Sequence, residues 1–102
     1  MFLFVYGTLK RGQVNHHLLN GDFVSKAKIF GFDLYDIGSF PGIYPGSEEV
    51  EGEIYRVNKK TIQFLDWFEI GYKREKIVID DKDVFVYVLL KPRGLKCKQW
   101  PK

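Results

Sequence analysis

A single glutamate stands behind a run of aromatic residues late in the chain. The stretch FLDWFEIGY, residues 64–72, places Glu69 directly after Trp67 and Phe68. Most glutamates lie in water, because burial of an unpaired ionised carboxylate is very unfavourable. A carboxylate held in an apolar pocket, by contrast, is suited to taking up and giving back protons. Glu69 is therefore the first candidate for chemistry in this sequence.

The helical pattern around this glutamate places it on the apolar side. We predict a helix over residues 59–69, with Asn58 as its N-cap. At about 100° per residue, Glu69 falls at about 340° from Ile62, and Leu65 falls at about 300°. The charged residues of the helix lie on the opposite arc. Glu69 thus shares the face that is expected to pack on the core.

Two effects are expected to raise the pKa of the Glu69 carboxyl. Desolvation disfavours the ionised form, and the negative end of the helix dipole does the same at a helix C-terminus. Both effects make Glu69 a candidate general base and acid. The alternative is that the helix ends before residue 69 and Glu69 pairs with Lys73 or Arg74 at the surface. The helical pattern alone does not decide between the two.

A second informative stretch is VYGTLKRG, residues 5–12. A strand that runs into Gly7 and Thr8 can turn its backbone N–H groups toward a common point, which suits a carboxylate or a phosphate. The loop is not a Walker A phosphate loop, because Gln13 stands where that motif requires lysine. An ordinary connection from strand to turn is the alternative.

Other reactive residue types are isolated. His16 and His17 are adjacent and diverge on a helix, and no further cluster of His or Cys could complete a metal site. Cys97 is the only cysteine, so no internal disulfide can form. Its neighbours Lys96 and Lys98 could lower its pKa, but no base is placed to orient it as a nucleophile. We expect neither a metal site nor thiol chemistry.

Strands are predicted to dominate the chain. Alternating or continuous apolar patterns bounded by glycine and polar clusters are typical of β-structure. The predicted extended segments are residues 2–6, residues 23–36 with an interruption at Gly31, residues 48–57 with a bulge near Gly52, and residues 72–79 and 84–90.

The connections complete the predicted fold. Residues 13–20 are long enough for a short helix or turn, and residues 38–46, with three glycines and two prolines, are predicted to be an irregular loop. The polar residues 80–83 should make a turn, so that the last two strands form a hairpin. This pattern favours an α+β fold with a mixed or largely antiparallel sheet, which can curl into a barrel, over a doubly wound fold.

The composition indicates one domain with a substantial core. The chain has 102 residues, of which 45% are hydrophobic and 17% aromatic. Its apolar runs are too short to span a bilayer, and its first residues lack the basic start and cleavage site of a signal peptide. We therefore expect a cytoplasmic protein with no membrane partner.

The formal net charge of +3 arises partly near the C-terminus. We divide the chain into a domain of residues 1–91 and a basic C-terminal tail of residues 92–102. A solvated tail is the expected interpretation, and an anion-binding patch is the alternative. Nucleic acid is not an expected partner, because most aromatic residues have predicted roles in the core. The cations without a neighbouring acid are Lys91, Arg93, Lys96, Lys98 and Lys102.

Taken in order, these motifs resemble the γ-glutamylcyclotransferase-like family, and most closely its γ-glutamylamine cyclotransferase branch. The resemblance covers most of residues 1–90 and implies a small, mixed, mostly antiparallel β-barrel with short flanking helices. It is carried by VYGTLKRGQVNHHLL at 5–19, VEGEIYRV at 50–57, FLDWFE at 64–69, YKR at 72–74 and VFVY at 84–87.

The resemblance also implies an activity and a set of site residues. Active members of the family convert γ-glutamyl compounds to 5-oxoproline and a released amine without a cofactor. Glu69 matches the catalytic carboxylate of the family. A looser match places Tyr72 and Tyr87 at positions where aromatic residues often line the pocket. The loop that holds the α-carboxylate of the substrate through backbone N–H groups is matched by Tyr6, Gly7, Thr8 and Leu9.

We therefore expect an enzyme that acts on a small γ-glutamyl substrate, with Glu69 as general base and acid. The α-amino group of the substrate would attack its own side-chain carbonyl, and the γ-glutamyl amide would be cleaved. Two alternatives keep the same pocket: a different amide-cleaving activity, and a non-catalytic protein that binds small carboxylates. The sequence leaves open whether the protein is a monomer or a homodimer.

Overall fold

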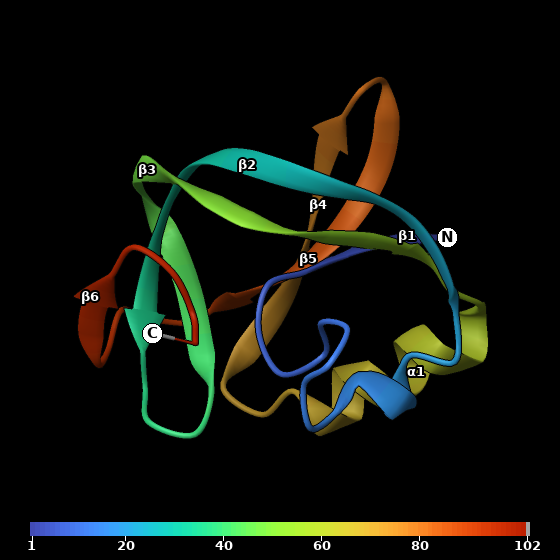
Figure 1. Cartoon of the computed structure of the whole chain (residues 1–102), viewed down its shortest axis with the longest axis horizontal. Helices are drawn as coiled ribbons and strands as arrows, with labels where there is room; N and C mark the ends of the chain where they lie inside the picture. The colour runs from blue at the N-terminus through green and yellow to red at the C-terminus, as the bar shows by residue number, and fades with distance from the viewer. Residues whose placement is uncertain (102) are drawn as a thin grey trace.

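The protein is a curled six-stranded sheet with one helix packed against it (Figure 1); the computed structural model describes residues 1–101. The strand order is β4-β5-β1-β3-β2-β6, and β1 pairs with β5 in parallel while the other pairs are antiparallel. The predicted α+β class with a mixed, mostly antiparallel sheet is confirmed, and the sheet curls into a half-barrel. The elements are β1 (Phe2–Val5), η1 (His16–Leu18, a 3-10 turn), β2 (Asp22–Asp36), β3 (Pro41–Arg56), α1 (Lys59–Phe68), β4 (Tyr72–Ile79), β5 (Lys82–Leu89) and β6 (Leu95–Cys97).

The central strand β1 is buried on both faces and contributes to two cores. Phe4 belongs to the core inside the curled sheet, whereas Leu3 and Val5 belong to the core between the sheet and α1. Successive side chains of a strand point to opposite faces, so a strand between two cores needs apolar residues at every position. This requirement explains the continuous apolar run FLFV at the start of the chain.

Local signals set both ends of α1. The Asn58 side chain accepts a hydrogen bond from the Thr61 N–H at 2.9 Å, which confirms the predicted N-cap. The helix ends at Phe68, one residue earlier than predicted. Gly71 then adopts a φ of +91°, which turns the chain directly into β4. The end of α1 and the start of β4 are therefore close neighbours.

The long pair of β2 and β3 is more regular than predicted. The predicted interruption at Gly31 is confirmed, because the register shifts there and its φ is +87°. The predicted irregular loop over residues 38–46 is wrong, because β3 begins at Pro41. Proline is tolerated as the first residue of a strand, and a Cβ on Gly42 would lie only 2.5 Å from the Leu89 side chain. These residues thus serve the packing of a strand.

The predicted bulge near Gly52 is also wrong. Gly52 pairs with Ala27 in regular register, and the nearby register shift lies in β2 between Phe23 and Ser25. The prediction rested on an inconsistent apolar phase along β3. The structure shows two cores as the reason: Ile54 faces the inside of the sheet, whereas Val57 packs under α1.

The chain after residue 91 contributes to the sheet. Strand β6 pairs with the end of β2, and the Lys96 ammonium lies 3.2 Å from the Asp33 carboxylate. The Lys96 and Lys98 side chains are exposed, as expected of a solvated basic tail, but the backbone of residues 95–97 is ordered by strand pairing. Lys102, which was assigned to the same tail, lies outside the described residues. The segment therefore has a defined place beside β2. Among residues 1–101, no helix is both long enough and apolar enough to cross a membrane.

Candidate active site

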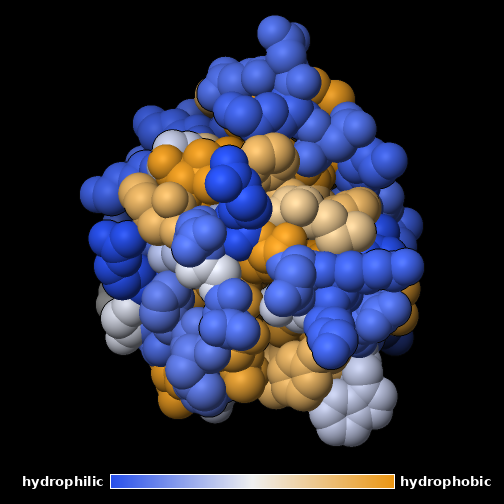
Figure 2. Space-filling view, turned by 90° about the vertical axis from the view of Figure 1, so that its right-hand side faces the viewer, coloured by the Kyte–Doolittle hydropathy of each residue, from blue (hydrophilic) through white to orange (hydrophobic). Residues whose placement is uncertain are grey.

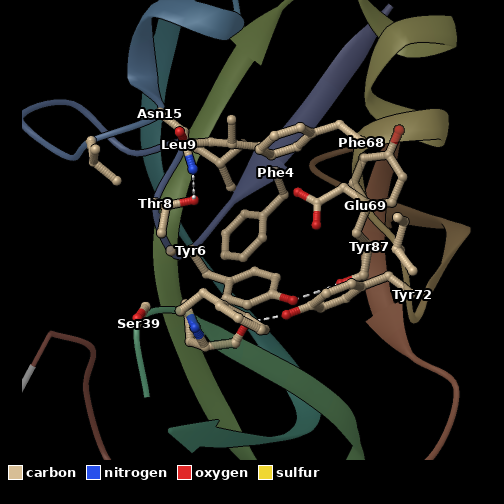
Figure 3. Close-up of a pocket in the computed structure, with 16 residues that line it drawn as sticks. Phe4, Tyr6, Thr8, Leu9, Asn15, Ser39, Phe68, Glu69, Tyr72 and Tyr87 are labelled. Atoms are coloured by element: carbon tan, nitrogen blue, oxygen red, sulfur yellow. Dashed lines mark hydrogen bonds between the residues drawn. The ribbon is translucent and has the colours of Figure 1, made fainter. Parts of the chain in front are cut away.

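A cavity of about 300 Å³ opens between the end of β1, the start of β3, the C-terminal end of α1, and strands β4 and β5 (Figure 3). The fold brings together segments that are some sixty residues apart in the sequence. Their assignment as substrate-binding and catalytic residues remains a prediction. All seven residues singled out from the sequence line this cavity: Tyr6, Gly7, Thr8, Leu9, Glu69, Tyr72 and Tyr87.

Glu69 caps the C-terminal end of α1, and its carboxylate points into the cavity (Figure 3). It does not form the surface pair that the sequence left open. Lys73 pairs with Glu75 at 3.1 Å, and Arg74 pairs with Asp66 at 3.5 Å. Among the described residues, no salt bridge reaches the Glu69 carboxylate. Its negative charge is therefore available to a cation that enters the cavity.

Burial raises the pKa of Glu69 from 4.5 to about 7. The carboxyl therefore titrates near neutrality, as expected from its apolar surroundings. Burial is also the largest cause that raises the pKa of Tyr6, Tyr72 and Tyr87, and the charge of Glu69 raises them further. The three phenols consequently stay protonated, and Glu69 is the group in the cavity that can exchange a proton near pH 7.

The three tyrosine hydroxyls are hydrogen-bonded to the protein. Tyr6 donates to the Tyr87 carbonyl at 2.8 Å, and Tyr72 donates to the Pro41 carbonyl at 2.5 Å (Figure 3). Tyr87 donates to the Asp66 carboxylate at 2.8 Å, on the α1 side of its ring. Since each hydroxyl proton already has an acceptor, the rings form and brace the walls of the cavity.

The loop of residues 6–9, which we call the clamp loop, has its carbonyl oxygens engaged. The carbonyls of residues 7, 8 and 9 accept, in that order, from the Lys10 N–H at 3.0 Å, the Asn15 N–H at 2.9 Å and His16 Nδ1 at 2.9 Å. A carbonyl can only accept, so Nδ1 of His16 carries the proton. The carbonyl and the N–H of a trans peptide point in opposite directions. The N–H groups of residues 8, 9 and 10 share a peptide with these three carbonyls, so they point away from the groups that the carbonyls bind.

The N–H groups of the clamp loop are available to a ligand. Among the described residues, no backbone carbonyl accepts from the N–H of Gly7, Thr8 or Leu9, and all three residues line the cavity. Adjacent free N–H groups form a concavity that binds anions such as carboxylate. The cavity thus has N–H donors on the side of the clamp loop and a carboxylate, Glu69, on the opposite side.

Tight packing explains why the second residue of the clamp loop, Gly7, is a glycine. A Cβ on Gly7 would lie 2.5 Å from Cγ of Pro41, so only glycine lets the first residue of β3 approach this closely. Pro41 in turn accepts the hydrogen bond from the Tyr72 hydroxyl. The clamp loop, β3 and β4 are therefore linked through one proline.

Asn15 is a site residue that the sequence reasoning did not single out. Its side-chain N–H donates to Thr8 Oγ1 at 3.1 Å (Figure 3), while its backbone N–H holds the Thr8 carbonyl. Asn15 lies within the same motif as the clamp loop, so that motif could have indicated it. Val5 and Val14 lie in that motif as well, and Phe68 lies in the motif of residues 64–69. No signal marked the other residues missed in the cavity wall: Phe4, Ser39, Phe40, Pro41 and Ile70.

The side of the molecule that carries α1 shows hydrophobic side chains between hydrophilic ones (Figure 2). Trp67 on α1 is 75% exposed, and Ile70, which follows the helix and lines the cavity, is 84% exposed.

Residues 1–101 hold no group of three or more His, Cys, Asp or Glu side chains placed to bind a metal ion. His16 instead packs its ring against Tyr55.

Comparison with known proteins identifies relatives over nearly the whole chain. Residues 3–102 match the family model described as gamma-glutamyl cyclotransferase, AIG2-like. The gamma-glutamylcyclotransferase family protein YtfP of Escherichia coli strain K12 is 35% identical over 101 residues, covering 94% of this chain and 89% of that protein. The gamma-glutamylaminecyclotransferase C of Danio rerio is 42% identical over 79 residues, covering 66% of this chain and 52% of that protein.

The fold has a close counterpart among solved structures. Protein PH0828 of Pyrococcus horikoshii superimposes with a TM-score of 0.86 at 29% sequence identity. The match covers 96% of this chain and 86% of that chain. The two proteins thus share the same overall fold.

Proposed function

The chain belongs to the γ-glutamyl cyclotransferase, AIG2-like family, and we propose that it releases 5-oxoproline and a free amine from a γ-glutamyl amine or a related γ-glutamyl compound. One observation carries the proposal. A partly buried carboxylate with a pKa of about 7 faces the free N–H groups of the clamp loop across a single cavity. Such a pair complements the two charged groups of the γ-glutamyl part of the substrate, which we call the γ-glutamyl head.

The γ-glutamyl head carries an α-ammonium, an α-carboxylate and a short methylene chain. Glu69 supplies the negative charge for the ammonium, and the clamp loop supplies N–H donors for the carboxylate. The rings of Phe4, Tyr6 and Tyr72 line the space between them, where they can pack on the methylenes. Among the described residues, no lysine or arginine lines the cavity, so no cation of its described wall competes with the substrate ammonium for Glu69.

The reaction follows from this placement. Ionised Glu69 takes a proton from the α-ammonium, and the free amine attacks the side-chain amide carbon to close a five-membered ring. The carbonyl π-electrons move to oxygen and give a tetrahedral oxyanion. Protonated Glu69 then gives the proton to the leaving nitrogen, the carbon–nitrogen bond of the amide breaks, and the carbonyl re-forms. The ring nitrogen still carries one extra proton, which Glu69 takes and passes to the released amine, so that the amine leaves as an ammonium ion and Glu69 is ionised again. The products are 5-oxoproline and the amine, and no water is consumed.

The cavity favours this reaction in two further ways. Ring closure is intramolecular, so holding the head in a folded conformation removes much of the entropic cost. The pKa of Glu69 near neutrality lets the same side chain be a base before ring closure and an acid after it. A glutamate with an ordinary pKa would be a poorer acid for the second step.

A substrate panel tests the proposal. The protein would be incubated with γ-glutamyl amines, with γ-glutamyl dipeptides and with isopeptides in which the γ-glutamyl group is linked to the ε-amino group of lysine. The release of 5-oxoproline would be measured. Glu69→Gln is the matched variant, because it keeps the shape of the side chain and removes the base. We expect release by the native protein and almost none by the variant. Equal release by both would overturn the role of Glu69, and ligand-induced stabilisation without product would indicate a binding protein instead.

A further inference from the structure

The mouth of the cavity has a different character from its interior. Three of its lining side chains are apolar yet exposed to solvent: Val14 at 74%, Phe40 at 37% and Ile70 at 84%. If the γ-glutamyl head occupies the space between Glu69 and the clamp loop, the leaving amine must extend past these side chains. The mouth is therefore where leaving groups can be distinguished.

A cation stands at this mouth. The guanidinium carbon of Arg93 lies 5.9 Å from the centre of the Phe40 ring, and the Arg93 side chain is exposed. Its charge also reaches the cavity wall, because it acts to lower the pKa of Tyr72 against the larger effects of burial and Glu69. Among residues 1–101, no carboxylate forms a salt bridge with Arg93. The guanidinium is thus placed to bind an anion.

The position of Arg93 is set by the fold of the C-terminal segment. Gly94 follows it with a φ of +84°, and a Cβ there would lie 2.4 Å from the Asp36 carbonyl oxygen. The next residues form β6, which pairs with the end of β2. Phe40 is held at the same corner, because its carbonyl accepts from the Ile37 N–H at 3.0 Å. Arg93 and Phe40 therefore come from two segments fixed to one end of β2.

The lysine of the neighbouring loop is engaged elsewhere. The Lys10 ammonium donates to the Trp100 carbonyl at 2.7 Å and is partly buried. This bond ties the C-terminal segment to the residue that follows the clamp loop. Arg93 remains the exposed, unpaired cation that contacts a residue of the mouth.

We propose that Arg93 is a specificity-determining residue that selects γ-glutamyl compounds whose leaving amine carries a carboxylate, with an apolar body that packs on Phe40 and Ile70. This inference rests on the proposed function. The favoured substrates are γ-glutamyl amino acids with apolar side chains, ahead of neutral γ-glutamyl monoamines, and γ-glutamyl diamines are the least favoured. A guanidinium binds a carboxylate through two parallel N–H donors, whereas it repels a second cation.

Three matched substrates test the proposal. The kcat/KM for 5-oxoproline release would be measured with γ-glutamyl-leucine, with the γ-glutamyl amide of 3-methylbutylamine, which lacks only the carboxylate, and with the γ-glutamyl amide of 1,5-diaminopentane. We expect the native protein to prefer the first over the second about fivefold, as for a partly exposed ion pair. The diamine amide should be slower again, and 0.5 M salt should reduce the differences.

Variants of Arg93 separate this inference from the proposed function. Arg93→Gln should process the neutral amide at the native rate and lose the preference, while Arg93→Lys should keep part of it. Lys76→Gln, which removes the same charge about 13 Å along β4 from Tyr72, should keep the full preference. An unchanged preference in Arg93→Gln would overturn the inference and leave the proposed function intact. Absence of 5-oxoproline from all three substrates would overturn the proposed function, and this inference with it.

Discussion

The two walls of the cavity use their polar groups in opposite ways. In the clamp loop, three successive carbonyls are hydrogen-bonded and Gly7 packs directly on Pro41. On the other wall, Glu69 is placed at the end of α1 with a partly buried carboxylate and no salt bridge among the described residues. One wall is thus organised to hold its shape, whereas the other keeps a carboxyl that titrates near neutrality, at the expense of stability.

The loss of stability caused by the desolvated Glu69 carboxylate depends on pH. The pKa of Glu69 rises from 4.5 to about 7 on folding, so between these pH values the folded protein binds more protons than the unfolded chain. The free energy of unfolding therefore falls as the pH rises from about 4.5 to about 7, and stays lowered above pH 7. The clamp loop has no titratable group with a comparable effect near neutrality, so the difference between the two walls can be measured.

The largest expected effect comes from removing the reactive group. In Glu69→Gln, kcat for 5-oxoproline release should fall by about 10³-fold, within the range for loss of a general acid–base residue. The control is Glu75→Gln, because Glu75 is a carboxylate on β4 that pairs with Lys73 and does not line the cavity, so this variant should keep native activity. If the two variants had similar kcat values, the reactive role of this wall would be refuted.

The pH dependence of the native enzyme should report the same carboxyl. Glu69 must be ionised in the free enzyme to accept the proton, so kcat/KM should fall about tenfold per pH unit below pH 7. A fit of kcat/KM measured from pH 5 to pH 9 should give an apparent pKa of about 7 for the acid limb of the profile. An acid limb near pH 4.5 would mean that Glu69 is not desolvated in solution.

The same substitution should raise stability while it abolishes activity. At pH 8, Glu69→Gln should be more stable than the native protein by about 3 kcal/mol, because the desolvated group no longer carries a charge. Its Tm should be about 15 °C higher. At pH 4 the carboxyl is protonated in both states, so the gain should vanish. Thermal unfolding at both pH values measures this, and equal gains at pH 4 and pH 8 would contradict the proposed cause.

On the clamp side, a substitution should affect binding and stability together. In Gly7→Ala, the added Cβ would lie 2.5 Å from Pro41, so the loop or the proline must move. We expect KM to rise about tenfold and the free energy of unfolding to fall by about 1–3 kcal/mol. Gly12→Ala is the control: its φ of +85° makes alanine strained, but no atom lies within 4 Å of the added Cβ. A KM as high in Gly12→Ala would show that loop strain, not the Pro41 contact, causes the effect.

Much of the fold could be predicted from residues that act locally. Asn58 caps α1, Gly31 marks a register shift, and the Asp80–Asp81 turn joins β4 and β5 with positive φ at both residues. The errors arose where distant contacts decide. Residues 41–46 have the composition of a loop, but they pair with β2 and make room for Leu89.

The candidate site was predicted in part for the same reason. Its motif residues all line one cavity, because the clamp loop and the end of α1 each carry a strong local pattern. Asn15 lay within that pattern and was overlooked. Phe40 and Arg93 carry no local pattern at all, because they meet only when the C-terminal segment pairs with β2.

The sequence by itself determined the apolar phase that turns Glu69 toward the core, the glycine and threonine of the clamp loop, and the family resemblance. These properties depend on neighbours within a few positions, so the order of residues is enough to reveal them. Only the tertiary structure decided that no cation among residues 1–101 forms a salt bridge with Glu69, that its pKa is about 7, and that Arg93 stands at the mouth. Desolvation and charge pairing depend on which distant segments surround a group, and folding alone brings those segments together.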